Sequence, residues 1–181
     1  MTNNQQPTTN NGFTLIEIMT SVSIFAIIMT ISMGSILGIF DANRKSRTLK
    51  AAMNNINLAI ESVSKEMRFG KNYHCGGGME TTPQNCPAGD NLVSFLSSEG
   101  EQVAYRLSGT TLEKKVDNGN YLPVTAPEVV IDSLVFYIVG AGTGNLLQPK
   151  VVVKVQGHSG SGDERTNFTL QTLISQRVLD L

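Results

Sequence analysis

The sequence predicts an α+β fold in which one long N-terminal helix is followed by an antiparallel β-sheet. Residues 13–69 contain no proline, and the apolar side chains of their second half recur at helical spacing. Residues 91–178 are divided instead into short runs of branched and aromatic residues with turn sequences between them. Helical and strand patterns are therefore segregated along the chain, which is typical of α+β proteins.

Residues 13–40 form an apolar run that is long enough to cross a membrane. A helix rises 1.5 Å per residue, so about 20 residues span ~30 Å of hydrocarbon. Glu17 is the single charged residue of the run. A carboxylate at this depth costs ~2.5–3.5 kcal/mol or more, so Glu17 needs a partner. Cleavage after Gly12 would create one, the α-amino group of Phe13, beside the unpaired N–H groups of the helix start.

Three other interpretations of the apolar run remain open. A secretory signal peptide has a basic start and a shorter apolar core, whereas this start is uncharged and this core is long. An ordinary single-span anchor explains the hydrophobicity but not Glu17. A buried helix of a soluble protein is usually shorter and rarely holds such a glutamate.

Residues 12–17, Gly-Phe-Thr-Leu-Ile-Glu, followed by the apolar run, resemble the N-terminal signal of type IV prepilins and type II secretion pseudopilins. The resemblance implies that a prepilin peptidase cuts after Gly12, removes the leader 1–12 and methylates Phe13. It implies that Glu17 acts in assembly with other pilins or pseudopilins on an assembly platform. It also implies storage in the bacterial inner membrane, with the head at residues 70–181 outside the cytoplasm.

The distribution of basic residues disagrees with that orientation. The leader has no lysine or arginine, and by the positive-inside rule the cations that follow the span would keep the head in the cytoplasm. The motif is more specific than this charge bias, so we expect the head to be extracytoplasmic. The cations after the span are Arg44, Lys45, Arg47 and Lys50.

Small residues recur every four positions within the run and predict a packing face for another helix. The alternative is that small residues are simply common in membrane helices. The residues of this stripe are Ala26, Thr30, Gly34 and Gly38.

Residues 41–69 predict an amphipathic second half of the helix, which ends at Gly70. One apolar seam faces the head, and a coiled coil is the alternative. The seam consists of Leu49, Met53, Ile56, Ile60, Val63 and Met67.

Cys75 and Cys86 lie in a stretch, residues 70–90, that is rich in glycine, proline and asparagine and is predicted to be a loop. Their separation suits a disulfide in an extracytoplasmic compartment. Free thiols and a metal site are the alternatives, although a zinc site needs more ligands than the neighbouring His74 supplies.

The head is predicted to contain seven strands, of which the first four form an antiparallel meander. The last strand is also compatible with a partly helical segment. The predicted strands are 91–97, 102–107, 111–116, 121–124, 129–139, 150–156 and 166–178.

This layout resembles the type IV pilin fold. Parts of the head also resemble minor pilins of the W or J type, which implies a tip or priming subunit rather than a shaft subunit. These parts are residues 105–107, 112–113, 135–136, 151–153, 168–172 and Arg177.

No pattern in the chain indicates an enzyme, a cofactor or a metal site. His74 and His158 are far apart and are expected to be solvated loop residues. A net charge of −1 argues against nucleic acid as a partner. A tip module that binds DNA, a surface or a secreted substrate, and an unprocessed single-pass anchor, are the alternative functions. The N-terminal chemistry does not distinguish motility, DNA uptake and secretion systems.

Overall fold

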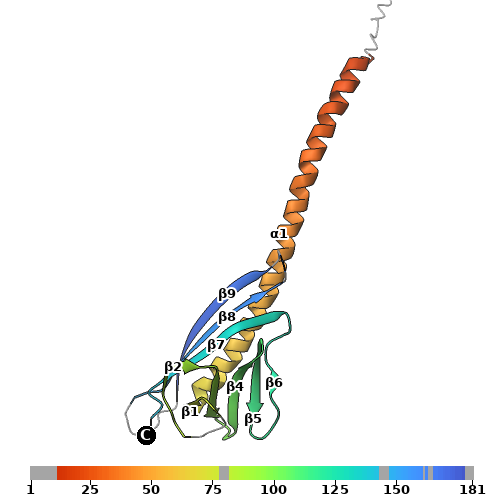
Figure 1. Cartoon of the computed structure of the whole chain (residues 1–181). Coiled ribbons are helices and arrows are strands. Elements are labelled where there is room, and N and C mark those ends of the chain that lie inside the picture. The colour runs from red at the N-terminus through yellow and green to blue at the C-terminus, as the bar shows by residue number, and fades with distance from the viewer. Residues whose placement is uncertain (1–11, 78–81, 143–146, 161, 163–164, 178–181) are drawn as a thin grey trace, which may run out of the picture. The chain divides into compact units, whose positions relative to one another are not determined.

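The described residues form one α-helix, α1 (Leu15–Phe69), and nine strands in two antiparallel sheets (Figure 1). The computed structural model describes residues 12–77, 82–142, 147–160, 162 and 165–177. The predicted α+β, type IV pilin-like fold is confirmed. The chain divides into two compact units, Met1–Arg44 and Lys45–Leu181.

The first unit contributes the apolar half of α1. From Leu15 to Phe40 every residue is exposed except Ser32, which is half-exposed. Among the described residues, α1 is the one helix that is long and apolar enough to cross a membrane, and none of its apolar window is buried by protein. The core helix of a soluble protein is usually covered by its own chain, and in the described residues this segment is not.

The second half of α1 packs against both sheets through small and large apolar side chains. Ile56, Val63 and Met67 of the predicted seam are buried. Met53 and Ile60 are only half-buried, whereas Ala52 and Ala59, which lie outside the predicted seam, are buried. The seam is therefore displaced from the prediction, because alanines let a helix backbone approach a sheet more closely than long side chains do.

The five-stranded sheet has the strand order β1-β3-β4-β5-β6. The meander predicted for residues 91–124 is confirmed, with ends that differ by at most two residues. Its strands, with β1, are β1 (Lys71–Cys75), β3 (Leu92–Leu96), β4 (Gln102–Ser108), β5 (Thr111–Val116) and β6 (Leu122–Pro123).

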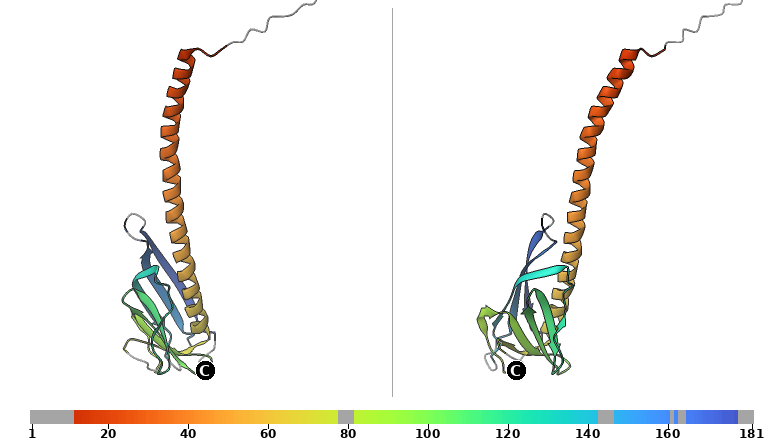
Figure 2. Two further views of the ribbon diagram at one scale, coloured as in Figure 1. Left: turned by 90° about the vertical axis from the view of Figure 1, so that its right-hand side faces the viewer. Right: turned by 45° about the vertical axis from the view of Figure 1, so that its right-hand side comes forward.

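The four-stranded sheet has the order β2-β7-β8-β9, and Figure 2 shows both sheets beside the second half of α1. The strand predicted for 150–156 runs three residues further, and the last strand contains no helix in its described residues. The strands are β2 (Cys86–Asp90), β7 (Val129–Val139), β8 (Lys150–Ser159) and β9 (Thr166–Ser175).

The prediction of a loop over 70–90 is wrong for β1 and β2. Both strands are irregular: their registers shift, and Asn72 of β1 has a φ of 56°. In β2, Gly89 has a φ of 81°, and a Cβ there would lie 2.4 Å from Cγ1 of Val135. Only glycine fits this bulge, so here a glycine permits close pairing of β2 with β7 within a stretch whose composition predicted a loop.

Cys75 and Cys86 form the predicted disulfide, with a Cα–Cα distance of 6.0 Å. Cys75 ends β1 of the five-stranded sheet, and Cys86 begins β2 of the four-stranded sheet. The bond therefore joins the two sheets where the chain crosses between them.

Two hydrogen bonds and close packing at Gly70 hold the C-terminal end of α1. The Tyr73 hydroxyl donates a hydrogen bond to the carbonyl of Met67, and the Arg177 N–H donates to the carbonyl of Arg68 at 2.8 Å. A Cβ on Gly70 would lie 2.5 Å from Cδ2 of Phe95. Gly70 is thus required by close packing, and donors from β1 and from the residues that follow β9 satisfy helix carbonyls that would otherwise lack them.

Candidate functional site

The first turn of α1 forms a reciprocal capping box between Thr14 and Glu17. The Thr14 N–H and the Thr14 hydroxyl each donate to Oε2 of Glu17 at 3.1 Å. The Glu17 N–H donates to Oγ1 of Thr14 at 3.4 Å. Two N–H groups at the start of the helix are thereby satisfied, and the carboxylate also lies at the positive end of the helix dipole.

This geometry gives Glu17 a partner within the intact chain. The partner lies three residues back, at Thr14, and not at Phe13 four residues back. The nitrogen of Phe13 is an uncharged amide while Gly12 precedes it. The capping box could have been found in the sequence, because threonine followed three residues later by glutamate before an apolar run is its signature.

The peptide bond between Gly12 and Phe13 lies just before the helix and is exposed on both sides. The Phe13 side chain is 84% exposed. A Cβ added at Gly12 would meet no atom within 4 Å, and Gly12 has no positive φ. The described part of the fold therefore places no packing demand on Gly12.

The four residues of the small stripe lie exposed on the apolar half of α1. Gly34 and Gly38 have no atom within 4 Å of an added Cβ. The Thr30 hydroxyl donates to the carbonyl of Ala26 at 2.8 Å, so its polar group is satisfied inside the helix. The stripe is an exposed surface of small residues that no described part of its own unit covers.

The two histidines lie on strands, so their prediction as solvated loop residues is wrong. His74 of β1 is buried, and its Nδ1 lies 2.8 Å from the carbonyl oxygen of Thr82. Nδ1 of His158 of β8 lies 2.9 Å from Oδ2 of Asp132. Within the described part of the chain, no three histidine, cysteine or acidic side chains are grouped so as to hold a metal ion.

Comparison with protein-family models matches residues 8–33 to the prokaryotic N-terminal methylation motif. No curated protein and no solved structure matches the chain. The matched segment contains Gly12, Phe13 and the whole capping box. The chain therefore carries a type IV prepilin-like signal at the start of its membrane helix.

Proposed function

We propose that this chain is a minor pilin or pseudopilin, a structural subunit of a type IV pilus or a type II secretion pseudopilus, and not an enzyme. One observation carries the proposal: within residues 8–33, the methylation motif coincides with an exposed Gly12–Phe13 bond and an uncovered apolar helix. An apolar surface of this length needs either lipid or other helices around it. A filament subunit that is stored in a membrane has lipid around this surface before assembly and other helices around it afterwards.

Prepilin peptidase acts first in the proposed sequence of events. It hydrolyses the bond after Gly12, releases residues 1–12 and methylates the new amino group of Phe13. The absence of any local packing demand on Gly12 supports a role in fitting an enzyme's active site. An α-amino group has a pKa near 8 in model peptides, so cleavage places a positive charge one residue before the capping box at neutral pH.

Assembly then exchanges the partner of Glu17. In the membrane-stored subunit, the Glu17 carboxylate accepts the hydrogen bonds of the capping box. A helix N-cap of this kind typically stabilises a helix by about 1 kcal/mol. In the filament, the Phe13 ammonium of a neighbouring subunit pairs with it. Leaving one member of a buried ion pair alone costs about 3–5 kcal/mol, so only the axial register that pairs both charges is stable.

The head lies outside the cytoplasm in this proposal. The Cys75–Cys86 disulfide supports that side, because structural disulfides persist in oxidising compartments and are rare in the cytosol. It outweighs the cations that follow the span, which bias topology without deciding it. Thiol trapping of whole cells, followed by a non-reducing gel, should find both cysteines oxidised, and free thiols in fresh cells would contradict the orientation.

The processing step is tested with Gly12→Leu in cells that contain an active prepilin peptidase. We expect the wild-type chain to begin at Phe13 with one added methyl group, and the variant to keep its leader. Gly77→Leu is the matched control, because Gly77 is also exposed and has no atom within 4 Å of an added Cβ. Intact-mass and N-terminal analysis of the membrane fraction measure the outcome. A wild-type protein that still begins at Met1 would overturn the proposed function.

A further inference from the structure

We propose that the open edge of β9 is a docking site for an extended segment of another protein chain. The segment would join the four-stranded sheet as a fifth, antiparallel strand. It would carry apolar side chains at alternate positions and acidic side chains at its N-terminal end. The proposal concerns the second unit, Lys45–Leu181, and does not depend on cleavage of the leader.

The four edge strands of the described sheets are protected to very different degrees. β1 and β2 have five residues each and shifted registers, and β2 contains Pro87. β6 has two residues, one of them Pro123. β9 has ten residues in unbroken register with β8, without a charged residue, proline or glycine. Proteins usually block unwanted edge pairing with charges, prolines, bulges or short strands, and β9 alone has none of these.

Hydrogen bonding shows which backbone groups of β9 face the open edge. The Gln176 N–H donates to the carbonyl of Pro149 at 3.0 Å, directly after the last paired residues, Ser175 and Lys150. In an antiparallel ladder, backbone groups point alternately toward and away from the neighbouring strand. The even-numbered residues of β9 therefore bond to β8. The backbone groups that face outward belong to the odd-numbered residues Asn167, Thr169, Gln171, Leu173 and Ser175.

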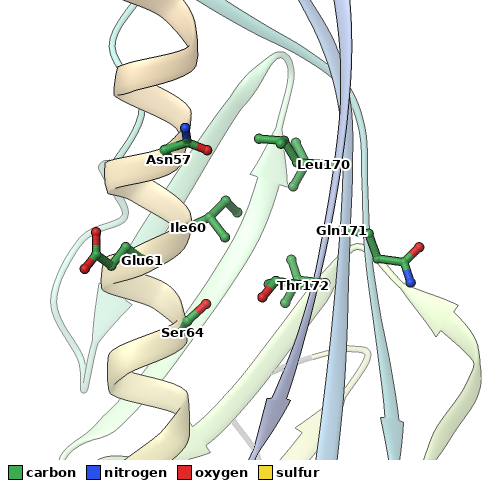
Figure 3. Close-up of a pocket in the computed structure, with 9 residues that line it drawn as sticks. Asn57, Ile60, Glu61, Ser64, Leu170, Gln171 and Thr172 are labelled. Carbon is green, nitrogen blue, oxygen red and sulfur yellow. The ribbon is translucent and has the colours of Figure 1, made fainter.

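A groove between α1 and β9 would receive the side chains of an added strand. The cavity measures about 340 Å³. Leu170 and Thr172 point from β9 toward the helix, whereas Gln171 points away (Figure 3). Ile60 and Leu170 in this groove are half-buried and continue the hydrophobic core. Alternate side chains of an added strand would face the same side as Leu170, so apolar side chains fit there.

The next cavity along α1, of about 280 Å³, adds charge to the site. It lies at the C-terminal end of β9 and is lined by Lys65, Arg68 and Arg177, with Glu61 as its single acidic residue. None of these three cations forms an ion pair with another described residue. An antiparallel partner strand begins at this end, so acidic residues at its N-terminal end would be attracted.

A second copy of this chain is the other occupant that the test must distinguish. Antiparallel pairing of two β9 strands would relate the copies by a two-fold axis across the sheet. Such pairing would produce a dimer, whereas binding of a segment from a different chain would not.

The test measures binding of a synthetic peptide to the purified full chain in detergent micelles. The probe is a fluorescent peptide of alternating valine and threonine with aspartates at its N-terminal end, and fluorescence anisotropy reports binding. Gln171→Pro removes an outward N–H without breaking a bond to β8, so the sheet is retained. Thr169→Pro does the same two residues earlier. Gln171→Ala is the matched control, because it changes the same side chain and keeps the N–H.

We expect each proline variant to weaken peptide binding by at least about tenfold and Gln171→Ala to leave it unchanged. Arg177→Gln should weaken binding of this peptide, and a peptide with aspartates at its C-terminal end should bind less tightly. Circular dichroism should show the same fold in all variants. Absence of peptide binding to the wild-type chain, or wild-type affinity in both proline variants, would overturn the proposal. A wild-type dimer in sedimentation that Gln171→Pro dissociates would identify a second copy as the occupant instead.

Discussion

The Tyr105 hydroxyl on β4 donates a 2.9 Å hydrogen bond to Oε2 of Glu66 on α1. Nζ of Lys114 on β5 donates to the other carboxylate oxygen at 2.6 Å. Burial, and secondarily the negative charge of Glu66, raise the pKa of Tyr105 well above its usual range. One helix carboxylate thus holds two neighbouring strands, and burial together with its charge keeps the phenol protonated to higher pH.

Tyr105→Phe should lower the free energy of unfolding by about 1–2 kcal/mol. The change removes a charge-assisted hydrogen bond and keeps the ring, and Glu66 retains Lys114 and partial solvent exposure. Urea unfolding of the full chain in detergent measures the loss. Tyr121→Phe is the control, because its ring still stacks under Arg106 at 3.6 Å. Equal losses in the two variants would refute a specific role for the Glu66 contact.

The same contact predicts a loss of stability at alkaline pH. In the unfolded chain Tyr105 ionises near its ordinary pKa of about 10, whereas the folded chain retains the proton to higher pH because the pKa is raised. The unfolded state therefore binds fewer protons above pH ~10, and stability falls there by up to ~1.4 kcal/mol per pH unit. The stability difference between wild type and Tyr105→Phe should be constant below that pH and shrink above it. A difference independent of pH would contradict the prediction.

Glu17→Ala should leave cleavage after Gly12 largely intact and impair incorporation into filaments. The variant loses both the capping bonds to Thr14 and the group proposed to pair with a neighbour's ammonium. The ratio of mature protein in sheared filaments to that in membranes measures incorporation. Asp41→Ala, an exposed acidic position later in α1, serves as the comparison. Normal incorporation of Glu17→Ala would eliminate the proposed exchange of partners.

Replacing both Cys75 and Cys86 by serine should lower the free energy of unfolding by about 3 kcal/mol, the chain-entropy value for a loop of this size. The loss should come from the junction of the two sheets and leave processing unchanged. Reduction of the wild-type chain should reproduce the loss, and the double variant should not respond to reductant. A reductant-sensitive stability in the double variant would indicate that the effect lies elsewhere.

Prediction from sequence succeeded where a structure depends on neighbours along the chain. Strands 111–116 and 129–139 have the predicted ends, because alternation of side chains within one strand is a local property. The loop predicted for 70–90 failed because β1 and β2 owe their pairing to bulges at Asn72 and Gly89, which only distant strands make favourable. The capping box could have been predicted from the sequence, because both of its residues lie within one helical turn.

The order of residues alone determined the processing signal, the membrane half of α1 and the α+β division, since each rests on spacing and polarity over short distances. The tertiary structure decided the rest. Glu66 meets Tyr105 across 39 positions of sequence, and the disulfide joins two different sheets. Which strand stays at an open edge likewise depends on how strands are ordered in the folded sheet. A linear pattern does not contain that order, because it follows from the free energy of packing all strands together around one core.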